Sequence, residues 1–118
     1  MKLSSDQATR YARHVLLDEV GARGQLRLLG TSVEVRGAGA AAEEAVRYLV
    51  AAGVGEVVVG AELRKRYAET WADLNPEVQV TSAGECRHLL ELGPSDSRLE
   101  GVRAALELLV DVGVKGEA

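Results

Sequence analysis

A glycine turn in the first half of the chain has the residue types that suit phosphate binding. Gly37-Ala38-Gly39-Ala40-Ala41-Ala42 has the pattern G-x-G-x-x-A and lies between residues 32–36, which alternate in polarity, and the alanine-rich residues 41–52. Between a parallel strand and a helix, such a turn lets backbone N–H groups and the positive helix end approach an anion, because glycine has no Cβ in the way. A tight turn that binds nothing satisfies the same pattern, so both interpretations stay open.

A carboxylate about 20 residues beyond such a turn would be placed to bind a ribose. Gly60 occupies that place, and Glu62 follows two residues later. Glu62 is therefore a candidate ribose ligand, although the helix dipole also favours an acid in the first turn of a helix that binds nothing. The basic run at residues 64–66 leaves a similar choice between a phosphate contact and a solvated helix surface.

The chain has one cysteine, Cys86, and two histidines. An internal disulfide is therefore impossible, which fits a reducing compartment. A structural zinc site takes about four Cys or His ligands, so we expect no metal site. Arg87 and His88 beside Cys86 are cations of the kind that lowers a thiol pKa. Neighbours in sequence need not face each other, however, and we expect Cys86 to be structural and not catalytic.

Composition limits both the size of the fold and its partners. The 118 residues form one domain of ordinary size. A net charge of −4 argues against nucleic acid, which is bound through an excess of Lys and Arg. No stretch approaches the roughly 20 apolar residues of a membrane span, and the N-terminus has no apolar signal segment. We therefore expect a cytoplasmic protein without a nucleic-acid or membrane partner.

The elements that position these residues follow an α/β pattern. Apolar spacing and end signals predict helices over residues 5–17, 23–29, 41–52, 62–74, 86–92 and 98–112. Alternation and an apolar run predict strands over residues 32–36, 56–59 and 77–81. The first two strands and the helix between them form a βαβ unit, which should be parallel. We expect a Rossmann-like three-layer α/β/α domain with a short, mostly parallel sheet, in which residues 1–30 form two N-terminal helices and residues 31–118 the nucleotide-binding-type core.

Two of the predicted helices carry apolar stripes that indicate what they pack against. The stripe on the helix over residues 62–74 predicts a buried face, and its members are Leu63, Tyr67, Trp71 and Leu74. The helix over residues 98–112 has a narrower seam, suited to packing on a sheet or on a partner helix. Its members are Leu99, Val102, Leu106 and Leu109.

Five segments, in order, resemble the ThiF/MoeB/HesA family, the ubiquitin-activating-enzyme-like adenylyltransferases. They are Arg10–Leu17, the G-Q-x-x-L run Gly24–Leu28, Val33–Gly39, the Y-L-x-x-A-G-V-G run Tyr48–Gly55 and the L-N-P-x-V run Leu74–Val78. The resemblance implies a domain that binds ATP and Mg²⁺ and adenylates the C-terminal glycine of a ubiquitin-like or sulfur-carrier protein, usually as a dimer. It is specific in the first half of the chain and weak in the last third.

The resemblance also assigns roles to single residues. Arg13 matches the arginine that reaches into a neighbouring subunit's nucleotide site. Gly37 and Gly39 match the turn on the phosphate side, and Glu62 matches the second of two acids. The first acid falls on Gly60, and the place of the family's lysine is taken by Leu63. The family's loop with acidic, Asn and Arg residues is missing, its zinc cysteines are absent, and its later strand with a magnesium-side aspartate has no convincing counterpart.

These differences favour a truncated, degenerate member of the family. Adenylation depends on neutralising the charge of a triphosphate, and each lost electrostatic group costs about a hundredfold or more in rate. We therefore expect a non-catalytic domain that binds no cofactor and acts through protein association. The alternative is a minimal adenylyltransferase that binds ATP and Mg²⁺, in which Glu62 and Arg64 or Lys65 replace the lost groups.

A dimer is the expected assembly, either of two copies or of one copy with a full-length family member. In the second case Arg13 would complete the partner's site as a trans-acting arginine. The competing interpretation is that Arg13 pairs with Asp18 or Glu19 and anchors the first helix. A ubiquitin-like or sulfur-carrier protein is the further partner that the resemblance implies.

Overall fold

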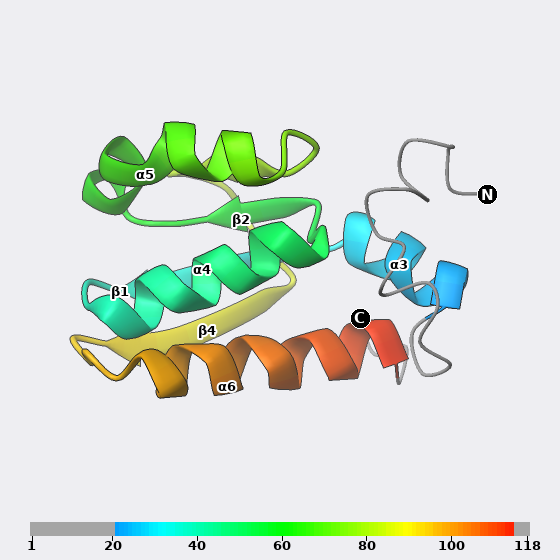
Figure 1. Ribbon diagram of the computed structural model, residues 1–118. Coiled ribbons are helices and arrows are strands. Elements are labelled where there is room, and N and C mark those ends of the chain that lie inside the picture. The colour runs from blue at the N-terminus through cyan, green and yellow to red at the C-terminus, as the bar shows by residue number, and fades with distance from the viewer. Residues whose placement is uncertain (1–20, 115–118) are drawn as a thin grey trace.

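A four-stranded parallel sheet is the scaffold of the computed structural model, which describes residues 21–114 (Figure 1). The strands are β1 (Ser32–Gly37), β2 (Glu56–Val58), β3 (Gln79–Thr81) and β4 (His88–Gly93), and their order across the sheet is β3-β2-β1-β4. Each neighbouring pair is parallel. The predicted helix over residues 5–17, with Arg13, lies outside the described residues.

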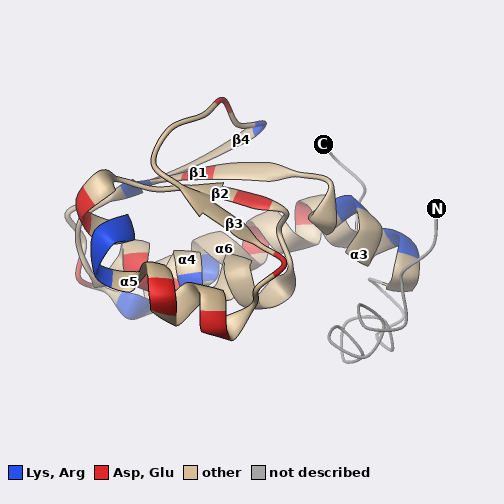
Figure 2. Ribbon diagram, turned by 90° about the horizontal axis from the view of Figure 1, so that it is seen from above, with Lys and Arg blue, Asp and Glu red and all other residues tan. Residues whose placement is uncertain are grey.

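Three helices cover one face of this sheet. They are α4 (Ala40–Ala52), α5 (Ala61–Leu74) and α6 (Arg98–Leu109), and Figure 2 shows all of them on the same side of the strands. Val33 and Val35 of β1 and Val57 of β2 are buried beneath them in the core. A short helix, α3 (Gly21–Leu29), lies at one end, where it contacts the π-helical turn η1 (Val110–Val114) that continues α6. The predicted Rossmann-like α/β fold with a parallel sheet is confirmed, but within residues 21–114 the helices cover one face of the sheet, so these residues form two layers where three were predicted.

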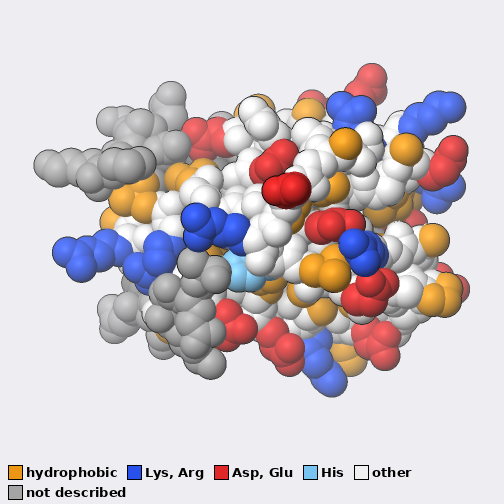
Figure 3. Space-filling view, turned by 180° about the vertical axis from the view of Figure 1, so that it is seen from behind, with side chains coloured by type: hydrophobic (Ala, Val, Ile, Leu, Met, Phe, Trp, Pro, Cys, Tyr) orange, Lys and Arg blue, Asp and Glu red, His pale blue; other side chains and the backbone are white. Residues whose placement is uncertain are grey.

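The other face of the sheet is polar and is crossed by residues 82–87 on their way from β3 to β4. Gly84 lies against Val58, and the N–H of Arg87 donates to Oγ of Ser32 at 3.1 Å. Arg36 pairs with Glu34 at 2.9 Å and with Glu91 at 3.8 Å. Figure 3 shows acidic and basic side chains interspersed over this side. The alternation in β1 thus reflects one buried and one solvated face.

The prediction of a helix over residues 86–92 is wrong, because this segment contains β4. The side chains alternate: Leu90 and Leu92 pack against the core, whereas Leu89 and Glu91 are exposed. The segment pairs with β1 from Val33↔His88 to Gly37↔Gly93. A leucine-rich segment with charges suits either structure, and the open edge of β1 decides between them.

The predicted stripes on two helices are only partly buried. In α5, Leu63 and Trp71 are buried, but Leu74 in the last position is 43% exposed, so its predicted burial is wrong. In α6 the buried residues are Gly101, Ala105 and Leu108, and the predicted seam lies beside them, with Leu99 66% and Leu106 47% exposed. A Cβ on Gly101 would overlap the carbonyl oxygen of Ala41, so small residues let α6 approach α4 closely.

Two buried amides hold the carboxyl end of α4. Nε2 of Gln25 donates to the carbonyl oxygen of Ala52 at 2.7 Å, and Nδ2 of Asn75 donates to that of Val50 at 2.9 Å. Gly53, in the left-handed conformation with φ of 88°, ends the helix. The last carbonyl groups of a helix have no partner within it. Gln25 satisfies that of Ala52, and Asn75 adds a second hydrogen bond to that of Val50, which also accepts the N–H of Gly53 at 3.1 Å. None of the helices within residues 21–114 is long and apolar enough to cross a bilayer.

Candidate functional site

A cavity of about 420 Å³ opens where β1 and β2 end and α4 and α5 begin. Gly37 and Ala38 form one wall, and Gly60, Glu62 and Arg66 belong to the other. The carboxyl ends of parallel strands are where α/β folds place their ligands. Two of the predicted site residues, Gly37 and Glu62, are therefore brought together, while Gly39 is not among the residues that line this cavity.

Gly37 has to be a glycine for reasons of backbone geometry. Its φ is 151°, which other residues rarely adopt, and a Cβ there would lie 2.7 Å from the carbonyl oxygen of Gly93. That oxygen also accepts the N–H of Ala38 at 3.2 Å. The turn after β1 is thus shaped by the end of β4.

Gly39 is required by a second close approach. It is the N-cap of α4, and its φ of −99° and ψ of −172° are open to any residue. A Cβ on Gly39, however, would overlap the carbonyl oxygen of Ser95 and lie 2.8 Å from Oδ1 of Asp96. The glycine therefore leaves room for the loop between β4 and α6, which occupies the place beside the turn.

The same loop satisfies the N–H groups at the start of α4. The N–H of Ala40 donates to Oδ1 of Asp96 at 3.3 Å, and the N–H of Ala41 donates to the carbonyl oxygen of Ser95 at 3.1 Å. The first N–H groups of a helix have no partner within it and carry its positive end. Here a carboxylate of the chain itself lies at that end, so a phosphate would have to displace a like charge.

The arginine side chains on the α5 side of the cavity already form contacts with other groups of the chain. Arg66 lies 4.0 Å from Glu43, whose other oxygen accepts the hydroxyl of Tyr67 at 2.9 Å. Arg64 donates through Nε to the carbonyl oxygen of Val80 at 2.9 Å. Glu62 is exposed in the first turn of α5, where the helix dipole favours an acid without a ligand. Of the basic run, only Arg66 lines the cavity.

Cys86 is unsuited to nucleophilic chemistry. Partial burial raises the pKa of its thiol above the ordinary value, and the nearby carboxylates of Glu56 and Glu34 add to this, against a hydrogen bond with Ser32 that lowers it. A raised pKa leaves less of the reactive thiolate at neutral pH. Within residues 21–114, no three or more His, Cys, Asp or Glu side chains gather in a way that could bind a metal.

Asp96 and the strand that leads to it were not predicted from the sequence. The family's later strand, which ends near an aspartate, had no convincing counterpart there. The structure has such a strand, since β4 lies beside β1 and the Asp96 carboxylate follows it against the glycine turn. The expectation failed because residues 86–92 had been assigned to a helix. An acid placed shortly after a strand, in the turn before a capped helix, was the available signal.

Comparison with known proteins finds relatives that are named as an activating enzyme or as adenylyltransferases. The chain is 51% identical over 59 residues to the SAMP-activating enzyme E1 of Haloferax volcanii, an alignment that covers 50% of this chain and 22% of the relative. It is 34% identical over 116 residues to the adenylyltransferase and sulfurtransferase MOCS3 of Arabidopsis thaliana, covering 91% of this chain and 25% of the relative. The mouse protein of that name is 49% identical over 55 residues, which are 47% of this chain and 12% of the relative.

This chain therefore spans a quarter or less of the length of these relatives. No family model matches it.

Proposed function

The chain is homologous to part of the ThiF/MoeB/HesA adenylyltransferase domain, and from this premise we propose that it is a non-catalytic member that acts by associating with another protein. The observation that carries the proposal is that the chain's own loop between β4 and α6 occupies the place beside the glycine turn. The N–H groups of Ala40 and Ala41, which would face a phosphate, already have acceptors in Asp96 and Ser95.

The charge around the cavity supports the same proposal. Nucleoside triphosphates are bound and activated by cations and metal ions that neutralise their oxygens. Among the described residues that line the cavity, Arg66 is the sole cation, and it lies beside Glu43. Gly60 and Leu63 stand where the family has an acid and a lysine. ATP and Mg²⁺ therefore fit this site poorly.

Association is then the remaining activity of such a domain, and a dimer is its simplest form. The partner is a second copy or a full-length relative, and a ubiquitin-like or sulfur-carrier protein is the further class that the relatives suggest. The trans-acting role of Arg13 belongs to this proposal and stays a prediction. A cytoplasmic location also stays a prediction.

One observation favours the alternative, a minimal adenylyltransferase. Asp96 follows β4 and lies directly beside the turn after β1, and its contact with Ala40 is a long hydrogen bond of 3.3 Å from an exposed residue. Carboxylates that accompany substrate phosphates are typical Mg²⁺ ligands. If Asp96 turned away from Ala40, its carboxylate would be available for this purpose, with Glu62 and Arg66 on the opposite wall.

Calorimetric titration with ATP, in the presence and absence of Mg²⁺, distinguishes the two functions. We expect no binding tighter than about millimolar, because a triphosphate would meet the Asp96 carboxylate and one cation. Asp96→Asn is the informative variant, since it removes the charge and keeps the shape. Micromolar binding by the parent that requires Mg²⁺ and is lost in Asp96→Asn would contradict the non-catalytic proposal and support the alternative.

A further inference from the structure

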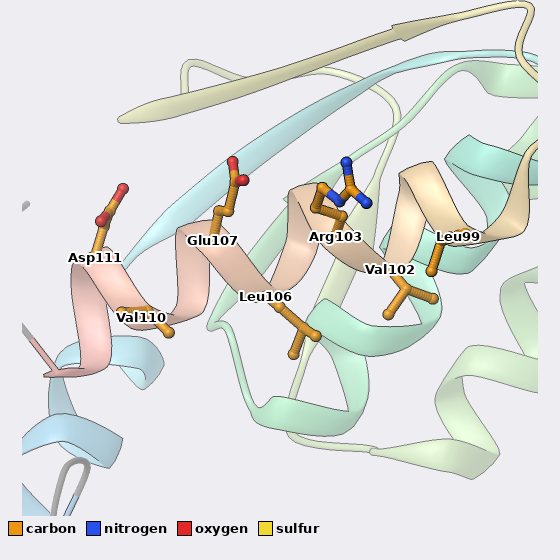
Figure 4. Close-up of a pocket in the computed structure, with 7 residues that line it drawn as sticks. All are labelled: Leu99, Val102, Arg103, Leu106, Glu107, Val110 and Asp111. Carbon is orange, nitrogen blue, oxygen red and sulfur yellow. The ribbon is translucent and has the colours of Figure 1, made fainter.

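An apolar stripe runs along the exposed side of α6 and continues into η1. Figure 4 shows Leu99, Val102, Leu106 and Val110 projecting to one side of the helix, and Arg103, Glu107 and Asp111 to the other. Leu99 is 66%, Leu106 47% and Val110 42% exposed. These side chains line a shallow groove of about 600 Å³. Their spacing of three and four residues gives a straight stripe along a helix.

This stripe is distinct from the face that packs on the rest of the domain. The residues of α6 that are buried against the domain are Gly101, Ala105 and Leu108. Of the five large apolar residues that are exposed in the described part of the chain, three belong to the stripe, and the others, Leu74 and Leu89, lie on α5 and β4. Contiguous exposed apolar surface with a charged rim is typical of an interaction site.

We propose that the stripe is the contact between two copies of this chain, with the two α6 helices packed antiparallel about a two-fold axis. The inference rests on the proposed function, because it names the partner of that association. It deepens the proposal by giving the surface, the partner and the direction of packing.

The charges beside the stripe favour a second copy in this orientation. Arg103 and Glu107 are one helical turn apart along one edge of the stripe, both exposed, and neither has an ion-pair partner among the described residues. In an antiparallel pair of helices with two-fold symmetry, each edge faces the same edge of the other helix, in reverse order. The edge is therefore complementary to itself.

The positions of these residues along the axis of α6 are compatible with antiparallel packing. With the two-fold axis at the level of Ala105, Arg103 lies opposite Glu107 of the second copy, and Glu107 lies opposite Arg103. Leu99 then lies within one residue of the level of Val110 of the second copy, and the two Leu106 side chains pack next to the axis. The apolar stripe and the charge pairs are thus satisfied by one register.

The dimer should be weak, because the contact is small. The 12 residues of α6 extend for about 18 Å, and one helix face is smaller than the roughly 800 Å² that each partner buries in a stable interface. We therefore expect a dissociation constant in the micromolar range, at which monomer and dimer are both measurable.

Sedimentation velocity over a concentration series, at low salt, tests whether the stripe on α6 is the contact between two copies. The parent should show a reversible monomer–dimer equilibrium, and Leu106→Glu should be monomeric throughout, with an unchanged far-UV circular dichroism spectrum. The matched control is Leu89→Glu, since Leu89 is 48% exposed on β4 and Leu106 is 47% exposed on α6. A monomeric parent, or a dimer disrupted by Leu89→Glu and not by Leu106→Glu, would overturn the inference.

A charge exchange tests the antiparallel register. Arg103→Glu places acid opposite acid twice, and Glu107→Arg places base opposite base twice, so each variant alone should dimerise about tenfold more weakly than the parent. A mixture of the two variants restores both pairs and should form heterodimers at least as well as the parent forms homodimers. A mixture that associates no better than its components would exclude the antiparallel register.

The outcomes separate this inference from the proposed function. A chain that binds no ATP and is monomeric would leave the non-catalytic role standing with some other partner, and would refute self-association. A chain that binds ATP tightly and still dimerises through Leu106 would refute the non-catalytic role and leave the α6 contact established.

Discussion

Substitution of Gly39 by alanine tests whether the glycine turn is shaped for a ligand or for the chain's own loop. The backbone at Gly39 has a φ of −99°, which alanine adopts freely, so a glycine kept only for phosphate could be replaced without loss of stability. The structure predicts the opposite. An alanine Cβ would overlap the carbonyl oxygen of Ser95 and lie 2.8 Å from Oδ1 of Asp96.

The magnitude follows from which atoms must move. Moving the backbone of Ser95 would weaken a hydrogen bond, because its carbonyl oxygen accepts the N–H of Ala41 at 3.1 Å. Forcing an extra carbon into such a contact typically costs about 1–3 kcal/mol. Against this, the reduced freedom of the unfolded chain favours alanine by only about 0.4–1 kcal/mol. We therefore expect Gly39→Ala to lower the free energy of unfolding by roughly 1–2 kcal/mol in the absence of any ligand.

Gly60→Ala is the matched control for this measurement. Gly60 is likewise an N-cap with extended backbone and no side-chain cap, at the start of α5, but a Cβ there would meet no atom within 4 Å. Both substitutions change the cap in the same way, so their difference isolates the clash. Urea unfolding at 25 °C measures both. Equal stability of the two variants would refute the clash between a Cβ at position 39 and Ser95. It would favour the interpretation that the glycine serves phosphate binding.

Two further predictions concern α4 and the charges along it. Gln25→Ala should lower the free energy of unfolding by about 1–3 kcal/mol, because it removes the hydrogen bond to the buried carbonyl group of Ala52. Asn75→Ala should cost less, about 0.5–1.5 kcal/mol, because the carbonyl group of Val50 still accepts the N–H of Gly53 at 3.1 Å. Urea unfolding without loss in either variant would contradict this. The hydrogen bond from Arg47 lowers the pKa of the Glu44 carboxyl, so the pair stabilises the fold above the pKa of an unfolded glutamate, about 4.3, and less as pH falls through the lower folded value. Arg47→Met should cost about 0.5–1 kcal/mol at pH 7 and progressively less below about pH 4, and a pH-independent difference in thermal unfolding would refute the role of Glu44.

Local patterns predicted most of the fold because those elements are determined by their own residues. The alternation of Val33 and Val35 with polar neighbours predicted β1, and helical spacing predicted α4 and α5, with bounds that differ by only one or two residues. β4 could not be predicted in this way. Its residues suit a helix as well as a strand, and its structure depends on pairing with β1, more than 50 residues earlier in the chain.

The candidate site was predictable to the same extent. Gly37 ends β1 and Glu62 follows the next parallel strand, β2, which is why their sequence positions predicted a shared place. The occupant of the glycine turn was not predictable, since Ser95 and Asp96 reach Gly39 only because β4 lies beside β1. The seam on α6 was predicted, but the sequence left open whether it packs on the sheet or on a partner helix. Gly101 and Ala105 make the close packing on α4, so Leu99 and Leu106 of the seam remain exposed.

The residues that carry the family resemblance have structural reasons to be where they are. Gln25 of the G-Q-x-x-L run and Asn75 of the L-N-P run bind the last carbonyl groups of α4, and Gly53 ends that helix in the left-handed conformation. Gly39 accommodates the loop that satisfies its first N–H groups. Both ends of α4 are therefore held without any nucleotide. These contacts, together with the apolar stripe exposed on α6, support the proposal that the domain acts by binding a protein surface.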